Sequence, residues 1–305
     1  MELTCAALIL NHNGRALLPP LYQSLLNQRG LSAIVLIDNA STDDSIQLTQ
    51  TLSDRIEVIK NSENLDFGTA YNRAIATRSE DVILILNNDT IVHRDAVYRA
   101  LLFLEQNPEV GSVSLEGLDP THKAGFPVYS KPLRRFGKIL CQERRYSGPE
   151  DGAILADYFL WGAACCVRRP VFESVRFDED MDWYFEDVDL GWSIARTTGF
   201  RNVFLPSSTI YHLESTTSKT RFQKKRLERM TARNAMIAFA KNGTWLDLLI
   251  AAPRMLYRLI DQPKKWELIS LLLRKRRERA PSVPLKVLSG PLKLKIEGPL
   301  TFSSS

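Results

Sequence analysis

Strand-like and helix-like patterns alternate through the first part of the chain, and this alternation constrains the fold more than any other feature. Apolar runs predict strands over residues 3–11, 33–41, 56–61 and 81–89. Helical spacing of apolar residues predicts helices over 14–28, 43–52, 68–79 and 94–108. Strands that are apolar on both faces and separated by helices are typical of a parallel sheet that is covered on both sides. We therefore expect an α/β fold with a Rossmann-like, mostly parallel sheet flanked by helices.

The pattern changes after about residue 110. Further strands are predicted at 110–117, 153–172 and 201–215, and further helices at 183–200 and 221–243. The stretch 119–150 is irregular and rich in Pro, Gly, Lys and Arg, which is typical of a functional loop. We expect this stretch and the segment 214–222 to close over a substrate and exclude water.

Basic residues are concentrated at the C-terminal end. Residues 241–305 contain 13 Lys and Arg against 5 Asp and Glu, whereas residues 1–240 contain 27 against 30. A nucleic-acid-binding protein would be more evenly basic, so we expect no nucleic acid partner. We predict one domain over 1–240, a basic amphipathic helical extension over 241–280 and a poorly packed tail over 281–305.

The extension leaves two interpretations open. Its apolar runs are broken by charges and prolines and fall short of the roughly 18 residues that a membrane-spanning helix needs. Residues 244–280 either make a peripheral contact with a membrane surface or pack as helices on the main domain. The four cysteines lack metal-ligand spacing, which indicates a reducing compartment. The apolar start of the chain indicates a first strand rather than a signal peptide, so we expect a cytoplasmic protein, at the inner face of the cell membrane if the first interpretation holds.

Polar side chains follow each of the first four predicted strands, at the point where the strand ends. They are Asn11, Asp38, Asn64, Asn88 and Asp89, and Asn72 lies in the helix that follows Asn64. The ends of parallel strands share one edge of a sheet, and α/β proteins bind ligands at that edge. One such cluster could cap a helix, but several together predict a single binding crevice.

A phosphate group in this crevice would need a positive partner. Neither GxGxxG nor GxxxxGK[ST] occurs in the chain, so the usual glycine-rich phosphate cradles are absent from the sequence. A divalent cation is the alternative, because such cations prefer oxygen ligands and can bridge phosphate oxygens. Asp89 is best placed to hold one, although a single aspartate at this position is more often a helix N-cap.

Five segments together resemble the family 2 glycosyltransferases, which have the GT-A fold. In chain order they are VLIDNASTDDS, NLDFGTAYNRAI, LILNNDT, FLWGAACCVRR and WYFEDVDLGWSIARTTGFR, and the resemblance covers about residues 3–240. The rhamnosyltransferase-like branch is the most similar in pattern. LILNNDT looks like the family's DxD-type metal motif, but Asn87 and Asn88 leave Asp89 as its one carboxylate. The resemblance implies a GT-A-type sheet and an inverting transfer of a sugar from a nucleotide-diphosphate sugar.

The acidic start of the helix predicted at 183–200 is the candidate catalytic segment. Acidic residues at a helix N-terminus pair favourably with the helix dipole, which is the structural explanation. The preceding aromatic residues suggest more, because burial beside Trp183 would raise the pKa of a carboxyl group towards that of a usable base. The resemblance implies that Asp187 is this general base, with Glu186 or Asp189 as alternatives.

The resemblance also implies a metal site and a set of substrate-binding residues. His212 would join Asp89 in holding Mg²⁺ or Mn²⁺. The substrate-binding candidates are Asn11, Asp38, Asn64, Asn72, Asn88, Trp161, Gly162, Trp183 and Glu186. The resemblance implies a UDP- or dTDP-type donor and a glycan or lipid-linked acceptor, as in envelope polysaccharide biosynthesis.

Three other functions compete with this interpretation. A nucleotidyltransferase would need a loop rich in glycine and basic residues after the first strand, where the chain has NHNGRALLP. A catalytically inactive module that binds nucleotide sugar or carbohydrate stays open because the metal motif has a single carboxylate. A membrane-surface scaffold would depend on the basic C-terminal part.

Overall fold

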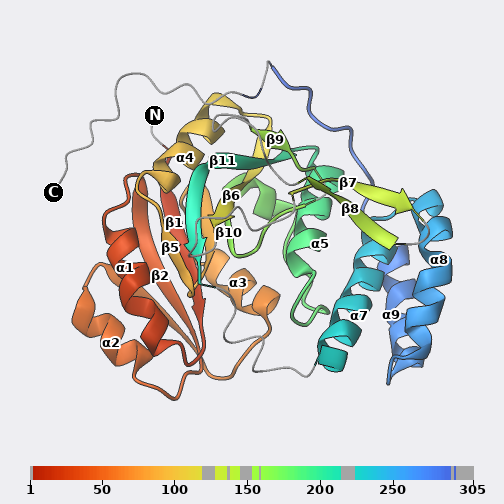
Figure 1. Cartoon of the computed structure of the whole chain (residues 1–305), viewed down its shortest axis with the longest axis horizontal. Helices are drawn as coiled ribbons and strands as arrows, with labels where there is room; N and C mark the ends of the chain where they lie inside the picture. The colour runs from red at the N-terminus through yellow and green to blue at the C-terminus, as the bar shows by residue number, and fades with distance from the viewer. Residues whose placement is uncertain are drawn as a thin grey trace.

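A nine-stranded mixed sheet forms the centre of the computed structural model (Figure 1). The structure describes residues 3–118, 128–135, 138–144, 153–157, 159–213, 224–289 and 292. The strands follow the order β3 (Ile56–Asn61), β2 (Leu31–Asn39), β1 (Cys5–Asn11), β4 (Val82–Asn87), β10 (Ala164–Arg168), β6 (Val110–Leu118), β11 (Arg201–His212) and β5 (Thr90–Val92). The short strand β9 (Ile154–Leu155) pairs with β11.

The first four strands in the chain are parallel and in register at their carboxyl ends. Asn11 of β1 lies opposite Asp38 of β2, and Leu10 lies opposite Asn87 of β4. β10 is antiparallel to both of its neighbours, β4 and β6, whereas β6 and β11 are parallel. The predicted mostly parallel α/β sheet is therefore confirmed, and one antiparallel strand joins its two halves.

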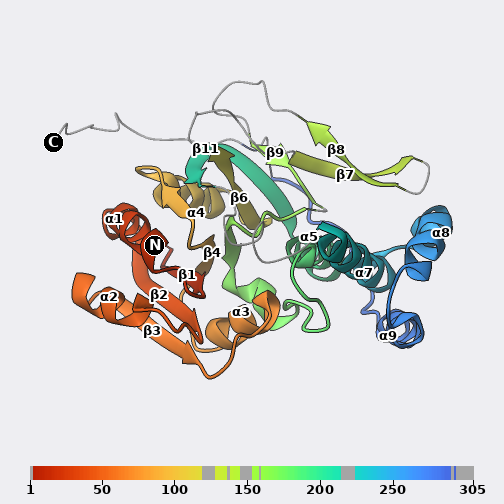
Figure 2. The ribbon, with the colours of Figure 1, turned by 60° about the horizontal axis from the view of Figure 1, so that its bottom comes forward.

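Helices cover both faces of the sheet because alternate strand residues point to opposite sides. Ala7 and Ile9 of β1 belong to a core shared with α1 (Leu18–Leu26) and α4 (Ala96–Gln106). Leu8 and Leu10 belong to a second core shared with α3 (Phe67–Ile75) and α5 (Glu186–Ser193). Figure 2 shows these two helix pairs on the two sides of the sheet, with α2 (Ser45–Leu52) beside α1.

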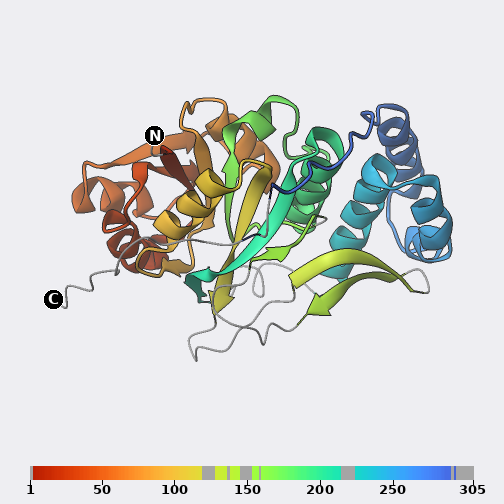
Figure 3. The same ribbon diagram turned by 90° about the horizontal axis from the view of Figure 1, so that it is seen from above.

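Three further helices form a group at one end of the molecule (Figure 3). They are α7 (Lys224–Asn242), α8 (Trp245–Ile260) and α9 (Lys265–Arg277). A capping box begins α8, in which the Asp247 backbone N–H donates to Thr244 Oγ1 over 3.1 Å. α7 packs against α5 and crosses the domain boundary predicted at residue 240. No helix in the described ranges is both long and apolar enough to cross a membrane.

Several predicted elements differ in detail from the structure. The stretch 119–150 contains an antiparallel hairpin of β7 (Val128–Arg135) and β8 (Lys138–Arg144), so the prediction that it is wholly irregular was wrong. The helix predicted over 183–200 is shorter, because α5 begins at Glu186 and ends in a π-helical turn, η3 (Ile194–Thr198). The strand pair predicted at 201–215 is the single strand β11. The segment predicted to close over the site at 214–222 lies outside the described residues.

Candidate active site

A cavity of about 370 Å³ lies where β1, β2 and β4 end and where α5 begins. Nearly all the candidate residues of the metal, acidic and acceptor-side motifs line it. They are Asn88, Asp89, Trp161, Gly162, Trp183, Glu186, Asp187 and His212. His12 also lines the cavity, together with Asn39, Phe67, Tyr184 and Phe185.

Amide side chains link the ends of β1 and β4 at the edge of this cavity. Asn88 Nδ2 donates to Asn11 Oδ1 over 2.8 Å, and Asn11 Nδ2 donates to Ser41 Oγ over 3.2 Å. Gly14 crosses directly above the two asparagines: a Cβ atom there would lie 2.3 Å from Asn11 Oδ1 and from Asn88 Nδ2. Only glycine fits this crossing without a shift, so Gly14 keeps the strand ends close.

Asp38 and Asn64 lie next to the cavity rather than in its lining. Asp38 is 2% exposed, and its Oδ2 accepts a hydrogen bond from the Ser41 backbone N–H. No described residue donates to its Oδ1, so one buried carboxylate oxygen is available to a ligand. Asn64 Oδ1 accepts from Asn39 Nδ2 over 2.9 Å, which places Asn39 between Asn64 and the cavity.

Asn72 has a different position from the one that a donor-binding residue needs. Its Nδ2 donates to the Phe177 carbonyl and to Glu179 Oε1, and its Oδ1 accepts from the Phe177 backbone N–H. These contacts attach α3 to the segment before α5, and Asn72 does not line the cavity. In this structure its side chain supports the fold, and donor binding by Asn72 stays a prediction.

Asp89 and His212 approach each other from β4 and β11. The distance between Asp89 Oδ1 and His212 Nε2 is 3.2 Å, and the two residues are 6% and 8% exposed. The indole of Trp161 meets the imidazole edge-on with ring centroids 5.8 Å apart. A carboxylate oxygen and an imidazole nitrogen fit a divalent cation whose remaining ligands come from a bound phosphate or water. No third His, Cys, Asp or Glu completes a ligand group in the part of the chain that the structure describes.

The two acidic residues at the start of α5 point into the same cavity. Asp187 Oδ2 accepts from the Gly162 backbone N–H over 3.0 Å, and Asp187 Oδ1 accepts from the Val188 backbone N–H over 2.7 Å. A Cβ atom at Gly162 would lie 3.0 Å from Asp187 Cβ, so a glycine allows this close approach. Glu186 is 8% exposed, and no described residue bonds to its Oε2.

The surroundings of Asp187 and Glu186 shift the pKa of both carboxyl groups. Burial raises the pKa of Asp187, while its hydrogen bonds from backbone N–H groups oppose that rise by stabilising the anion. Burial raises the pKa of Glu186 further, and the negative charge of Asp187 adds to the effect. Both carboxyl groups therefore hold a proton more readily than exposed ones, and the backbone hydrogen bonds to Asp187 favour its anion.

An unusual backbone turn aims these carboxyl groups at the cavity. Tyr184 and Phe185 have positive φ angles of 74° and 76°, a conformation that costs free energy for non-glycine residues. Asn234 of α7 holds the turn: its Nδ2 lies 3.3, 3.2 and 2.7 Å from the carbonyl oxygens of Asp182, Trp183 and Tyr184. Asn234 is fully buried, and no local sequence pattern predicts this contact between segments about 50 residues apart.

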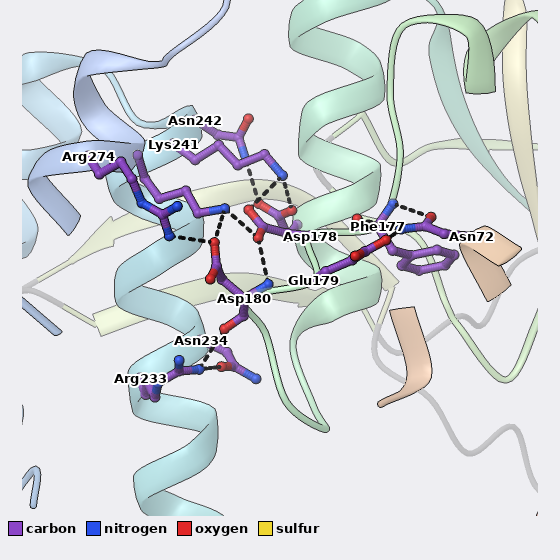
Figure 4. A network of polar contacts seen from close by, with 12 residues as sticks. Asn72, Phe177, Asp178, Glu179, Asp180, Arg233, Asn234, Lys241, Asn242 and Arg274 are labelled. Atoms are coloured by element: carbon purple, nitrogen blue, oxygen red, sulfur yellow. Dashed lines mark hydrogen bonds and ion pairs between the residues drawn. The ribbon is translucent and has the colours of Figure 1, made fainter. Parts of the chain in front are cut away.

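Asp189 has a structural role in this structure and does not line the cavity, and its role as an alternative base stays a prediction. It is fully buried, and it bonds to Lys241 Nζ over 2.6 Å and to Asn242 Nδ2 over 2.7 Å. Lys241 and Lys275 also contact Asp178, and the network of Figure 4 extends from there to Asp180 and Arg274. These ion pairs attach α5 and the preceding segment to α7 and α9.

Part of the chain resembles a known protein family. Residues 7–142 match the sequence model of a family described as glycosyl transferase family 2. This match covers slightly less than half of the chain. The match ends before α5, so Asp187 and His212 lie outside it.

Curated relatives of this chain include enzymes named as rhamnosyltransferases. An N-acetylglucosaminyl-diphospho-decaprenol L-rhamnosyltransferase of Mycobacterium tuberculosis is 26% identical, with 62% of this chain and 68% of the relative covered. The O-antigen chain rhamnosyltransferase WbaN of Salmonella anatum is 23% identical, with 67% and 62% covered. An uncharacterized protein of Sinorhizobium fredii is 25% identical, but the match spans only 21% of its length. The chain thus matches from about a fifth to about two thirds of the length of these relatives.

Solved structures confirm the GT-A-type fold of this chain. A mannosyltransferase from Pyrobaculum calidifontis in complex with GDP-Man and Mn²⁺ has a TM-score of 0.57 at 16% identity, with 90% of this chain and 74% of that chain covered. GalNAc-T7 with UDP, GalNAc and Mn²⁺ has a TM-score of 0.65 at 14% identity, with 91% and 55% covered. At these identities the likeness concerns the fold alone.

Proposed function

We propose that this chain is an inverting glycosyltransferase that moves a sugar from a nucleotide-diphosphate sugar to a hydroxyl group of a glycan or lipid-linked acceptor. One observation carries the proposal: Asp187, Asp89 and His212 open into the same cavity at the carboxyl edge of a family 2 sheet. Rhamnosyltransferase relatives support a sugar-transfer reaction, and one of them is named for a diphospho-decaprenol acceptor. A UDP- or dTDP-type donor is part of the proposal.

The donor would lie across the strand ends. Asn11 and Asn88 shape that edge. Asp38 Oδ1 accepts no hydrogen bond from a described residue, so it would accept one from an O–H or N–H group of the donor's ribose or base. Asp89 and His212 would hold Mg²⁺ or Mn²⁺, which would supply positive charge to the diphosphate leaving group. The metal motif has one carboxylate here, so phosphate oxygens of the donor would be needed as further ligands.

Asp187 would act on the acceptor side. Its carboxylate takes the proton of the acceptor hydroxyl as that oxygen forms a bond to the anomeric carbon, and the bond from that carbon to the diphosphate oxygen breaks. One displacement inverts the anomeric centre and leaves Asp187 protonated until solvent removes the proton. Trp161 and Trp183 supply flat apolar walls on either side of this point, on which a sugar ring can stack.

The C-terminal helices would place the enzyme at a membrane surface. α8 exposes Trp245, Leu249, Leu256 and Ile260, which are 62% to 77% exposed. These four residues lie on one stripe of the helix, since their spacing returns to the same side every three to four residues. Basic residues are in excess in this part of the chain, which suits a membrane surface with anionic lipids. We propose a peripheral contact at the inner face of the cell membrane.

Turnover of nucleotide sugars by the purified chain tests the proposal. A panel of UDP-, dTDP- and GDP-sugars would be incubated with Mg²⁺ or Mn²⁺, and release of nucleoside diphosphate would be followed with and without acceptor. We expect release with at least one donor, and we expect Asp89→Asn to reduce it while Asp54→Asn, an exposed control, leaves it unchanged. Binding without turnover of any donor would favour an inactive nucleotide-sugar-binding module.

A further inference from the structure

An apolar groove of about 420 Å³ runs between α7 and α8, beside the candidate active site. Its described lining consists of Phe185, Leu227, Glu228, Thr231, Ala232, Ala235, Met236, Phe239, Ala251, Arg254, Met255 and Arg258. Two of the lining residues on α7, Ala232 and Ala235, have small side chains that leave the space open. A groove of this volume is within the range of small-molecule sites.

The chemistry of the lining selects the kind of occupant. Most of the lining atoms are hydrocarbon, so a peptide in the groove would leave backbone N–H and C=O groups without partners, which is costly. A flexible hydrocarbon chain has no such groups to satisfy. Met236 and Met255 add adaptable walls, since methionine side chains repack easily around irregular apolar shapes.

Phe185 connects the groove to the candidate active site. Its side chain belongs to the lining of both cavities, directly before Glu186 and Asp187. Its backbone is fixed by the turn that Asn234 of α7 holds. A molecule that lies in the groove therefore has one end close to the carboxyl groups.

Charge distinguishes the groove from an ordinary gap in packing. Arg254 and Arg258 are on its α8 side, and Glu228 is the one acidic residue in the described lining. Arg258 also interacts electrostatically with Asp261 beyond the end of α8. Two guanidinium groups beside an apolar channel suit a molecule with a phosphate group at the end of its chain. The opposite side of α8 carries the exposed stripe of Trp245, Leu249 and Ile260, so the groove lies behind the proposed membrane contact.

We propose that this groove holds the hydrocarbon chain of a polyprenyl-phosphate-linked acceptor, with Arg254 and Arg258 on its phosphate groups and the acceptor sugar in the cavity beyond Phe185. This inference rests on the proposed function and adds a class of acceptor and the site that recognises it. The chain would enter from the bilayer beside α8 and present its sugar hydroxyl to Asp187.

Binding of a polyprenyl phosphate to the purified protein in detergent micelles tests the site without needing turnover. Ala232→Phe fills the groove, and Ala252→Phe is the matched control, because Ala252 is also a half-buried helix alanine but does not line the groove. We expect at least tenfold weaker binding for Ala232→Phe and unchanged binding for the control. Arg254→Gln, which leaves the apolar packing intact, should weaken binding of the phosphate but not of the corresponding polyprenol.

Donor binding separates failure of this inference from failure of the proposed function. UDP binding should be the same in the wild-type protein and in Ala232→Phe, which also checks that the variant folds. Equal binding of the polyprenyl phosphate by Ala232→Phe and wild type would overturn the groove assignment and leave the glycosyltransferase proposal intact. Binding that is lost on Trp245→Ser but kept in Ala232→Phe would place the lipid on the outer face of α8 and would also overturn it. Polyprenyl phosphate binding in a protein that turns over no nucleotide sugar would contradict the proposed function instead.

Discussion

Lys241 joins two buried aspartates, and its replacement should destabilise the fold by an amount that the structure allows us to work out. Lys241 Nζ lies 2.6 Å from Asp189 Oδ2 and 3.3 Å from Asp178 Oδ2 (Figure 4). Asp178 has a second cation, Lys275, at 2.5 Å, whereas Asp189 has only the amide of Asn242 besides Lys241. In Lys241→Met, Asp189 therefore loses the one cation that contacts it directly among the described residues, and only the more distant Lys275 still acts on its charge.

The expected loss of stability follows from the removal of the lysine that pairs with Asp189. Removing one member of a buried ion pair typically costs about 3–5 kcal/mol, because the remaining charge stays desolvated. Burial already raises the pKa of Asp189, and Lys241 opposes that rise, so the variant should take up a proton on Asp189 instead of keeping a bare charge. We expect the free energy of unfolding in urea near neutral pH to fall by about 3 kcal/mol or more. Lys264→Met is the control, since the Lys264–Glu267 pair is 75% and 70% exposed and should contribute less than about 1 kcal/mol.

A second substitution tests the cause. Lys241→Met combined with Asp189→Asn removes the unpaired charge together with its partner and should recover part of the lost stability. A loss below about 1 kcal/mol for Lys241→Met, or no recovery in the double variant, would refute the view that this ion pair attaches α5 to α7.

Three further predictions concern carboxyl groups and the turn before α5. The base Asp187 is active when ionised and burial raises its pKa, so the rate of transfer should increase with pH over a range above that of an exposed carboxyl group. Glu186→Gln keeps Asp187 and should keep this increase, whereas an increase that disappears in this variant would assign the base to Glu186. Burial raises the pKa of Glu116 from 4.5 to about 7, so between these pH values the folded state holds a proton that the unfolded state has lost, and the stability falls as the pH rises. Glu116→Gln should be more stable than wild type by about 1–3 kcal/mol at about pH 8 and equally stable below pH 4.5, as measured by urea unfolding. Asn234→Ala removes the hydrogen bonds to the turn before α5, so the rate of transfer should fall by about tenfold or more while the affinity for UDP changes little. Equal losses of transfer rate and UDP affinity would indicate general unfolding instead.

The first half of the fold was predictable because its signals are local. Each of β1 to β4 is an apolar run with a polar end, and parallel pairing brings those ends together whatever the details of the helices. Asn11, Asn88 and Asp89 could therefore be placed at one edge from periodicity alone. Resemblance to a known family was needed for Asp187 and His212, since nothing local brings α5 and the end of β11 to that edge.

Contacts between distant segments account for what was missed. Asn72 looked like a donor-binding residue from its motif, but its amide is engaged by Phe177 and Glu179 more than 100 residues away. Asn234 gave no signal, because its role depends on a turn that precedes α5. Asn39 could have been found, since it follows Asp38 directly at the same strand end.

Sugar transfer and donor binding by Asp187→Asn, measured on the same preparation, test most directly whether one cavity both holds the donor and carries the base. Asparagine keeps the shape of the side chain, and Asp187 lies on the acceptor side, so calorimetric affinity for the donor in the presence of Mg²⁺ should stay within about twofold of wild type while the rate of transfer falls by about 100-fold or more. Transfer at the wild-type rate would contradict the account, because the proton would then leave the acceptor by another route.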